Sequence, residues 1–252
     1  MIHLYARKLS RQTVATGITG LLLLMRPAPA ISQDTGPAII RYEGTGNIFP
    51  ASWLDKKTRA RASAADTALF RNDSTLLYNA LGMYPSWLIE RELKNIFVVG
   101  KLSFNRQYFT GTNSKDAVYI AGEGNSDIEK TFHHEFSSIL LRNHSDLQLE
   151  KEWRSLSPAL RQGNSASAVQ AGLYSVDFDS SLCVRGYLSP YSLSNWENDF
   201  NIYAENIFAG GAAFWAIADH YPSVSTKMKL VVGFYHSIWP GYTETFFRAA
   251  IR

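Results

Sequence analysis

The pattern of hydrophobic and polar positions predicts helices over the first ordered part of the chain. Apolar residues recur at helical spacing in residues 52–70 and 73–84. A further short helix is expected from Pro85 to Leu93, because proline is well tolerated in the first helical turn. Residues 31–49 are polar and rich in glycine without a clear period, which predicts a flexible N-terminal lead.

The hydrophobic period changes in the middle of the chain. Residues 95–104, 106–112 and 116–122 are short runs of β-branched and aromatic side chains, separated by Gly, Asn, Ser and Asp. Such runs are typical of strands joined by turns, so we expect a small sheet of three strands. A helix is predicted next, over residues 127–143.

The last part of the chain is predicted to be helical. Residues 145–190 have no period that assigns an element, whereas helical spacing returns after Ser194 and continues to the C-terminus. The order of these elements predicts the α+β class, and the chain length fits a single domain over residues 50–252.

Residues 1–30 have the features of a secretory signal peptide. Arg7, Lys8 and Arg11 form a basic start, residues 13–25 are mostly apolar, and small residues precede Ile31. The apolar run is too short to span a bilayer, which takes ~20 helical residues. We therefore expect an exported protein, secreted or periplasmic, with no stable membrane span and no cysteine positioned for a lipid anchor.

The charge and the cysteine content bear on nucleic-acid binding and on how the fold is stabilised. Removal of residues 1–30 lowers the formal net charge from +3 to −1, because that segment carries four basic residues and no acidic one. A nearly neutral mature chain gives no electrostatic case for nucleic-acid binding, and the basic run at residues 56–62 is predicted to be a solvated helix face. Cys183 is the only cysteine, so we expect a fold held by its hydrophobic core and not by an internal disulfide.

The predicted helix over residues 127–143 contains the main functional candidate. Ile128, Phe132, Phe136 and Ile139 fall on one stripe that should face the core, and Glu135 lies inside this stripe. Burying an unpaired carboxylate costs several kcal/mol, so Glu135 must be paired, coordinated or placed in a polar cavity.

His134 and Glu135 have the order of an H-E-x-x-H zinc site. In such a site two histidines one turn apart bind the metal, and the glutamate takes a proton from the metal-bound water. Ser138 stands where the second histidine belongs, and a hydroxyl is a poorer zinc ligand than imidazole. The helix alone leaves open whether His134 and Glu135 bind a metal or are hydrogen-bonded structural residues.

The chain resembles the zinc-binding metallopeptidases of gluzincin type found among exported bacterial proteins. The resemblance covers about residues 60–250 and rests on "DAVYIAG", "TFHHEFSSIL", "SPYSLSNWENDFNIYAENIF" and "KLVVGFYHSIWPGYTETFF" in that order. Family members read H-H-E-F-x-H-I-L in the active helix and carry an acidic ligand on a later helix that often begins E-D-F-A-E. The resemblance implies a zincin-like α+β fold, with N-terminal helices and a small mixed sheet packed on the HHEF helix, followed by a mainly helical C-terminal part.

The resemblance also implies zinc as the cofactor and a role for individual residues. His134 matches the first metal ligand and Glu135 the general base. The third, acidic ligand is open among Glu197, Asp199 and Glu205, because the family motif aligns in more than one register. We favour Glu197, which lies at the edge of the apolar stripe of its predicted helix.

Two residues around that helix have alternative explanations. A capping box from Ser194 to Glu197 would account for the glutamate without any metal. Tyr191 resembles the tyrosine that some gluzincins direct at the developing oxyanion, although a tyrosine in a turn is also an ordinary packing residue.

Three functions are compatible with the sequence. The first is an exported zinc metallopeptidase with a degenerate site, which hydrolyses peptide bonds of a peptide or protein substrate through metal-activated water. The second is a catalytically inactive zincin-fold binding or cell-envelope module, which the serine at position 138 favours. The third is a secreted scaffold whose Trp and Tyr side chains bind a glycan or a partner protein.

Overall fold

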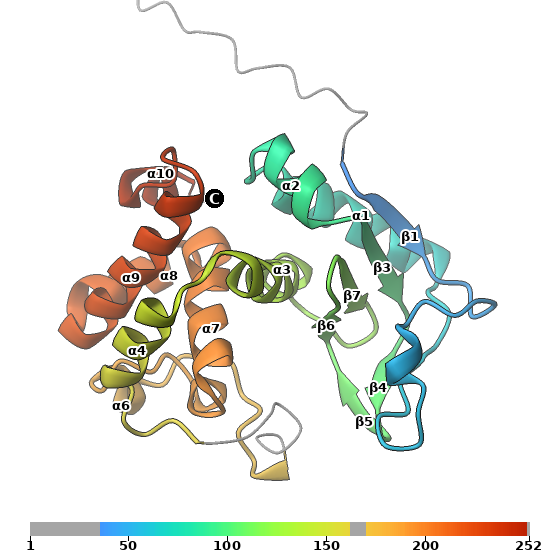
Figure 1. Cartoon of the computed structure of the whole chain (residues 1–252), viewed down its shortest axis with the longest axis horizontal. Coiled ribbons are helices and arrows are strands. Elements are labelled where there is room, and N and C mark those ends of the chain that lie inside the picture. The colour runs from blue at the N-terminus through green and yellow to red at the C-terminus, as the bar shows by residue number, and fades with distance from the viewer. Residues whose placement is uncertain (1–35, 162–169, 251–252) are drawn as a thin grey trace, which may run out of the picture. The chain divides into compact units, whose positions relative to one another are not determined.

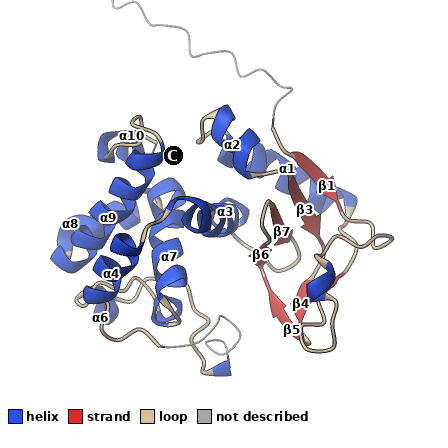
Figure 2. Ribbon diagram, viewed as in Figure 1, coloured by secondary structure: helices blue, strands red, loops and turns tan. Residues whose placement is uncertain are grey.

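The computed structural model describes residues 36–161 and 170–250 of the chain. The predicted signal peptide, residues 1–30, lies outside the described residues. The first part contains both strands and helices, and the second part is helical (Figures 1 and 2). The α+β class predicted from the sequence is confirmed.

Two small sheets form the β part. The larger sheet has the strand order β1-β3-β7-β6, in which β1 and β7 flank β3 in parallel and β6 pairs antiparallel with β7. The smaller sheet has the order β2-β4-β5 and is antiparallel. The strands are β1 (Ala38–Arg41), β2 (Arg61–Ala62), β3 (Asn95–Val99), β4 (Leu102–Phe104), β5 (Gln107–Phe109), β6 (Gly111–Asn113) and β7 (Ala117–Ala121).

The β part is larger than the three-strand sheet that the sequence predicted. The predicted strand over residues 95–104 is divided at Gly100, where a Cβ atom would lie 2.3 Å from the carbonyl oxygen of Ala64. The prediction of a flexible lead is wrong at residues 38–41, because Ile39 and Ile40 pair in register with β3. A four-residue strand is too short to show its period in the sequence.

The helix predicted over residues 52–70 is also wrong. A single 3₁₀ turn, η1 (Ala51–Trp53), is followed by a tight turn in which the Asp55 carboxylate accepts hydrogen bonds from the N–H groups of Lys57 and Thr58. The chain then enters β2, so the basic run at residues 56–62 forms a loop and a strand and not a helix face. Helix α1 begins after Asp66, whose side chain caps it by accepting hydrogen bonds from the N–H groups of Ala68 and Leu69.

The remaining helices follow the prediction closely, except that α4 and α6 lie in the segment without an assigned period. The helices are α1 (Thr67–Leu81), α2 (Ser86–Glu92), α3 (Ile128–His144), α4 (Leu147–Ser155), α6 (Ser180–Cys183), η2 (Pro190–Leu193), α7 (Trp196–Ala209), α8 (Gly211–His220), α9 (Pro222–Ile238) and α10 (Glu244–Ala249). Within residues 36–161 and 170–250, no helix is both long and apolar enough to cross a membrane.

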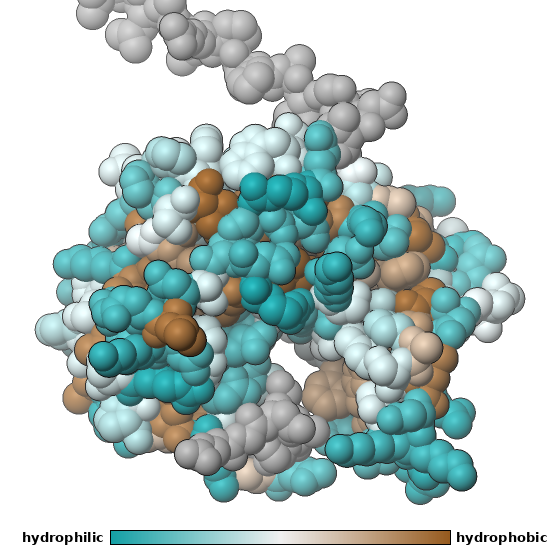
Figure 3. Space-filling view, viewed as in Figure 1, coloured by the Kyte–Doolittle hydropathy of each residue, from teal (hydrophilic) through white to brown (hydrophobic). Residues whose placement is uncertain are grey.

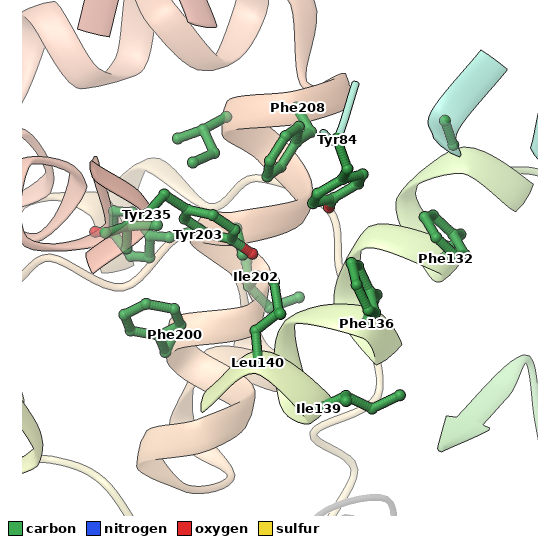
Figure 4. Close-up of a cluster of buried hydrophobic side chains, with 14 of the residues drawn as sticks. Tyr84, Phe132, Phe136, Ile139, Leu140, Phe200, Ile202, Tyr203, Phe208 and Tyr235 are labelled. Carbon is green, nitrogen blue, oxygen red and sulfur yellow. The ribbon is translucent and has the colours of Figure 1, made fainter. Parts of the chain in front are cut away.

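Helix α3 lies between the β part and the C-terminal helices (Figure 1) and packs against α7, with buried side chains from both helices between them (Figure 4). The stripe predicted to face the core is buried: Ile128, Phe132, Phe136 and Ile139 are at most 4% exposed. Aromatic rings fill the space between the two helices, with Tyr84 4.7 Å from Phe208 in a stacked arrangement. This packing fixes which faces of α3 and α7 are turned toward each other.

A buried ion pair adds to the packing of α7 on α9. Lys227 Nζ lies 2.6 Å from Asp199 Oδ2, and the two side chains are 1% and 0% exposed. Trp153 Nε1 donates to the same carboxylate oxygen at 2.9 Å, and the ammonium group lies 4.2 Å from the centre of the Tyr187 ring. Asp199 Oδ2 is therefore occupied by contacts within the helical part.

Candidate functional site

A cleft of about 820 Å³ runs beside α3, between the smaller sheet and the start of α7 (Figure 3). One wall comes from η1, β4 and β5, the floor from β6 and α3, and the other wall from η2 and the first turn of α7. Its lining includes Trp53, Phe104, Phe109, Gly111, Asn113, His134, Glu135, Ser138, Tyr191, Trp196 and Glu197. The cleft thus contains the histidine and the glutamate that the sequence singled out.

His134 reaches the cleft from α3 and is held from behind by α7. Its Nδ1 lies 2.8 Å from Glu205 Oε2, with the two side chains 12% and 7% exposed. Burial lowers the pKa of His134, but the hydrogen bond to Glu205 and the nearby charges of Glu135 and Glu197 outweigh it and raise the pKa above its ordinary value. The imidazole therefore has a fixed orientation and favours its protonated form.

Glu135 is anchored by the edge strand of the larger sheet. Asn113 Nδ2 donates to Glu135 Oε2 at 2.7 Å, and Arg142 Nη2 donates to Asn113 Oδ1 at 2.7 Å. Burial raises the pKa of Glu135, and the charge of Glu197 adds to the increase, while His134 opposes it. The sequence requirement that this carboxylate be paired or placed in a polar cavity is met by the cleft and by Asn113.

The contact between β6 and α3 depends on a glycine. A Cβ atom at Gly111 would lie 2.6 Å from Thr131 Cγ2 and 3.0 Å from Glu135 Cγ. Only a residue without a side chain allows the strand to approach the helix this closely. Gly111 therefore positions the strand, and with it Asn113, against Glu135.

Ser138 lies one turn after His134 and is joined to α7. Asn201 Nδ2 donates to Ser138 Oγ at 2.7 Å, and Asn201 and Ser138 are 0% and 4% exposed, respectively. Asn201 Oδ1 has no hydrogen-bond partner among the described residues. The position that corresponds to the second histidine of an H-E-x-x-H site is thus closed by a serine–amide hydrogen bond.

This contact also selects a register for the resemblance to E-D-F-A-E. Asn201 and Glu205 are four residues apart and lie on the same face of α7, facing Ser138 and His134, respectively. The motif then falls on residues 201–205, "NIYAE", with its final acid at Glu205 and its first acid replaced by Asn201. In this register an amide, Asn201, stands at the first acidic position of the motif and faces Ser138.

The three acidic candidates of the sequence have different surroundings. Glu197 lines the cleft, Glu205 contacts His134, and Asp199 is taken up by Lys227. Burial raises the pKa of Asp199 to about 6 despite its ion pair. The helix cap is made by Asn195, whose side chain accepts from the N–H of Asn198, so the Glu197 side chain is not needed for the start of α7.

Tyr191 and His133 lie in different parts of the molecule. The Tyr191 ring lies in the cleft, 6.1 Å from the His134 ring. His133 points into the core instead, where its Nδ1 lies 2.8 Å from the hydroxyl of Tyr84 and its ring stacks on Phe208 at 4.6 Å. The two adjacent histidines therefore have separate environments.

No prediction was made from the sequence for Asn113 and Asn201, the amides that hydrogen-bond to Glu135 and Ser138. Both act across long sequence separations, and an isolated asparagine carries no pattern. For Asn201 a signal did exist, since it lies one helical turn before Glu205 and so shares its face. For Asn113 nothing in the sequence distinguishes it from other turn residues.

The donor set of the cleft does not fit the zinc centre that the resemblance implies. Catalytic zinc is held by three protein side chains drawn from His, Asp, Glu and Cys. In the part of the chain that the structure describes, no three such side chains form a group that could hold a metal ion. The side chains of Ser138 and Asn201 are hydrogen-bonded to each other, and neither a hydroxyl nor an amide belongs to that set of ligands.

Comparisons with known proteins bear on the fold. No family model matches the chain, and a search of curated proteins finds no significant match. Among solved structures, the chain is similar to the crystal structure of "a putative zinc-binding metallo-peptidase" from Bacteroides caccae. The TM-score is 0.55 at 14% sequence identity, over 86% of this chain and 84% of that chain. The chain therefore has a metallopeptidase-like fold.

Proposed function

We propose that this chain is an exported protein that uses a metallopeptidase-like cleft to bind an extended peptide segment without hydrolysing it. The observation that carries the proposal is the open edge of β6 in the cleft, next to a ligand position closed by Ser138 and Asn201. The edge accounts for peptide binding, and the closed position accounts for the loss of metal-dependent hydrolysis.

The register of β6 decides which backbone groups face away from β7. Ala121 N donates to Thr110 O, and Ser114 N donates to Ala117 O, each at 2.8 Å. In an antiparallel ladder such pairs alternate, so the N–H and C=O groups of Gly111 and Asn113 point away from β7. Within the described chain β6 is the last strand of its sheet, and both residues line the cleft. An extended peptide can add to this edge through backbone hydrogen bonds.

The walls of the cleft suit apolar side chains of such a peptide. Trp53, Phe104 and Phe109 lie on the side of the smaller sheet, and Tyr191 and Trp196 on the side of α7. Ligand pockets combine aromatic walls with a few placed polar groups in this way. The aromatic walls would supply affinity by burial, and the strand edge would set the direction of the peptide.

A second function, zinc-dependent hydrolysis of peptide bonds, is favoured by one observation. The hydrogen bond between His134 and Glu205 has the form that orients a ligating histidine in metal centres. In this alternative His134 and Glu197 would be metal ligands, Glu135 the general base and Tyr191 the oxyanion donor. It requires zinc to bind with fewer protein ligands than catalytic sites use, so we place it second.

The test uses residues 31–252 immobilised on beads and a soluble library of unstructured random peptides, with Trp196→Ala as the cleft variant. Trp87→Ala is the matched control, because Trp87 is a partly exposed tryptophan on α2 that does not line the cleft. We expect the wild type and the control to retain peptides that Trp196→Ala releases, and mass spectrometry to find those peptides uncut in the presence of zinc. Retention that is equal for all three proteins would overturn the binding proposal, and cut peptides would favour the second function.

A further inference from the structure

The small sheet carries a dense group of basic side chains on the surface of the molecule. Its members, which we call the basic patch, are all exposed and come from two segments that are distant in sequence: Lys56, Lys57, Arg59, Arg61, Lys101 and Arg106. In Figure 3 this surface is the strongly hydrophilic region over β4 and β5, at the lower right.

Backbone pairing brings the two segments together. Asn105 N donates to Thr58 O at 2.9 Å, which joins the β4–β5 hairpin tip to the loop before β2. Arg61 pairs with Ser103 in the antiparallel ladder of β2 and β4. Arg106 at the hairpin tip therefore lies beside the basic loop, and the six cations share one surface region.

The positive charge of the patch is only weakly offset nearby. Two acidic side chains contact it: Asp55, whose carboxylate caps the turn at Lys57 and Thr58, and Glu123, which pairs with Lys101 at 3.2 Å. Residues 31–252 carry a formal net charge of −1, since the chain total is +3 and residues 1–30 hold four basic residues. The remainder of residues 31–252 therefore has a negative net charge, whereas the six cations of the basic patch form one positively charged region of the surface.

Two exposed hydrophobic side chains stand among these cations. Leu54 is 44% exposed directly before the basic loop, and Tyr108 is 70% exposed on β5 between the hairpin tip and the cleft. Basic residues interspersed with exposed aliphatic and aromatic side chains are characteristic of protein surfaces that rest on anionic bilayers. A phosphate-only partner would make no use of Leu54 and Tyr108.

Backbone conformation at the patch supports a role for the side chains themselves. Arg59 and Arg106 adopt φ values of +48° and +70°, in the left-handed region where glycine or asparagine is preferred. Arginine at both positions retains a charge where a small residue would fit the backbone better.

We propose that the basic patch binds the surface of a bilayer containing anionic phospholipids. The same segments supply Trp53, Thr58, Phe104 and Phe109 to the cleft, so the surface that meets the bilayer adjoins one wall of the cleft. The protein would then hold its cleft close to membrane-associated peptides. The inference rests on the patch alone and does not depend on what the cleft binds.

Co-sedimentation with vesicles tests the proposal. Residues 31–252 are mixed with vesicles of phosphatidylcholine alone or with phosphatidylglycerol added, and the patch variant is Lys56→Glu/Arg61→Glu/Arg106→Glu. The matched control is Lys151→Glu/Arg185→Glu/Lys229→Glu, which reverses three exposed cations outside the patch and has the same net charge. A second patch variant with glutamine at the same three positions removes the charges without adding acids.

We expect binding to the vesicles with phosphatidylglycerol and loss of that binding at high salt. Each basic residue near an anionic surface contributes about a fivefold gain in partitioning, so removing three of them with glutamine should cost on the order of 100-fold, and reversing them with glutamate should cost more. The glutamine variant should show a smaller loss and the control variant little change, while Tyr108→Ala should weaken the binding that remains at intermediate salt.

Three outcomes would overturn the inference. One is no binding of the wild type to either vesicle. Another is an equal loss in the patch and control variants, which would show that only net charge matters. The third is binding of an oligonucleotide duplex without binding of vesicles, which would assign the patch to a soluble polyanion.

Discussion

Replacing Ser138 by alanine should destabilise the fold, because the hydroxyl is the acceptor for a buried amide. Asn201 is 0% exposed, its Nδ2 donates to Ser138 Oγ at 2.7 Å, and its Oδ1 has no partner in the described part of the chain. The variant would therefore leave both polar atoms of the Asn201 side chain unsatisfied. An orphaned buried donor costs about 1–3 kcal/mol.

This magnitude predicts a shift that thermal denaturation can resolve. For a domain of this size each kcal/mol lowers Tm by about 2–4 °C, so Ser138→Ala should lower Tm by about 2–12 °C. Ser74→Ala is the matched control, because the hydroxyl of Ser74 donates to the carbonyl of Phe70 in its own helix and leaves no buried amide behind when it is removed. Its Tm should change by about 1–2 °C at most, as surface substitutions usually do.

A double variant separates the hydrogen bond from other effects of the substitution. In Ser138→Ala/Asn201→Leu both polar partners are removed together, which is close to neutral for a pair of this kind. The two substitutions should therefore be strongly non-additive, with a coupling free energy of about 0.5–3 kcal/mol. If Ser138→Ala melted like the Ser74→Ala control, the hydroxyl of Ser138 would not be the acceptor that stabilises the buried amide of Asn201.

Three further predictions concern the ion pair, the titration of the cleft and the edge strand. Lys227→Met should lower the free energy of unfolding by about 3–5 kcal/mol, because Asp199 stays buried without its cation. The double variant Asp199→Leu/Lys227→Met should recover most of that loss. Urea denaturation measures both changes, and an unchanged midpoint for Lys227→Met would contradict the prediction. The pKa values of Glu135 and His134 are raised in the folded protein, so the folded state holds their protons more tightly than the unfolded state does. The free energy of unfolding should therefore fall as the pH rises above the ordinary pKa values of these groups, about 4.3 for the carboxyl and about 6.5 for the imidazole. Glu135→Gln should flatten the acidic part of the curve of unfolding free energy against pH. A slope identical to that of the wild type would show that Glu135 does not have a raised pKa. Gly111→Val should lower Tm by several degrees and abolish peptide retention, because a Cβ atom at this position would lie 3.0 Å from Glu135 Cγ. If a folded Gly111→Val variant still bound peptides, the edge of β6 would not be the binding site.

The fold could be predicted where the hydrophobic period is long and regular. The stripe that contains Phe132 and Phe136 is enough to define α3 and its buried face from the sequence alone. Short strands were missed, because β1 and β2 are held by pairing with distant strands and not by their own sequence pattern. At residues 52–70 the helical spacing of apolar positions predicted a helix, but the turn at Asp55 and the cap at Asp66 divide that segment.

The candidate site could be predicted only in part. His134 and Glu135 were identified by their order and spacing, and the structure brings both into one cleft with Tyr191 and Glu197. The contact of His134 with Glu205 spans the helix pair and could not be derived from spacing along the sequence. Their functional roles remain predictions.

In our proposal His134 stands at the first ligand position of a zinc site, and a serine–amide hydrogen bond closes the position next to it. Zinc analysis of purified residues 31–252, dialysed against zinc, tests this proposal when the wild type is compared with Ser138→His/Asn201→Glu. We predict well under one zinc per chain in the wild type and one per chain in the double variant, lost again when His134→Ala is added. One zinc per wild-type chain that disappears in His134→Ala alone would contradict the proposal.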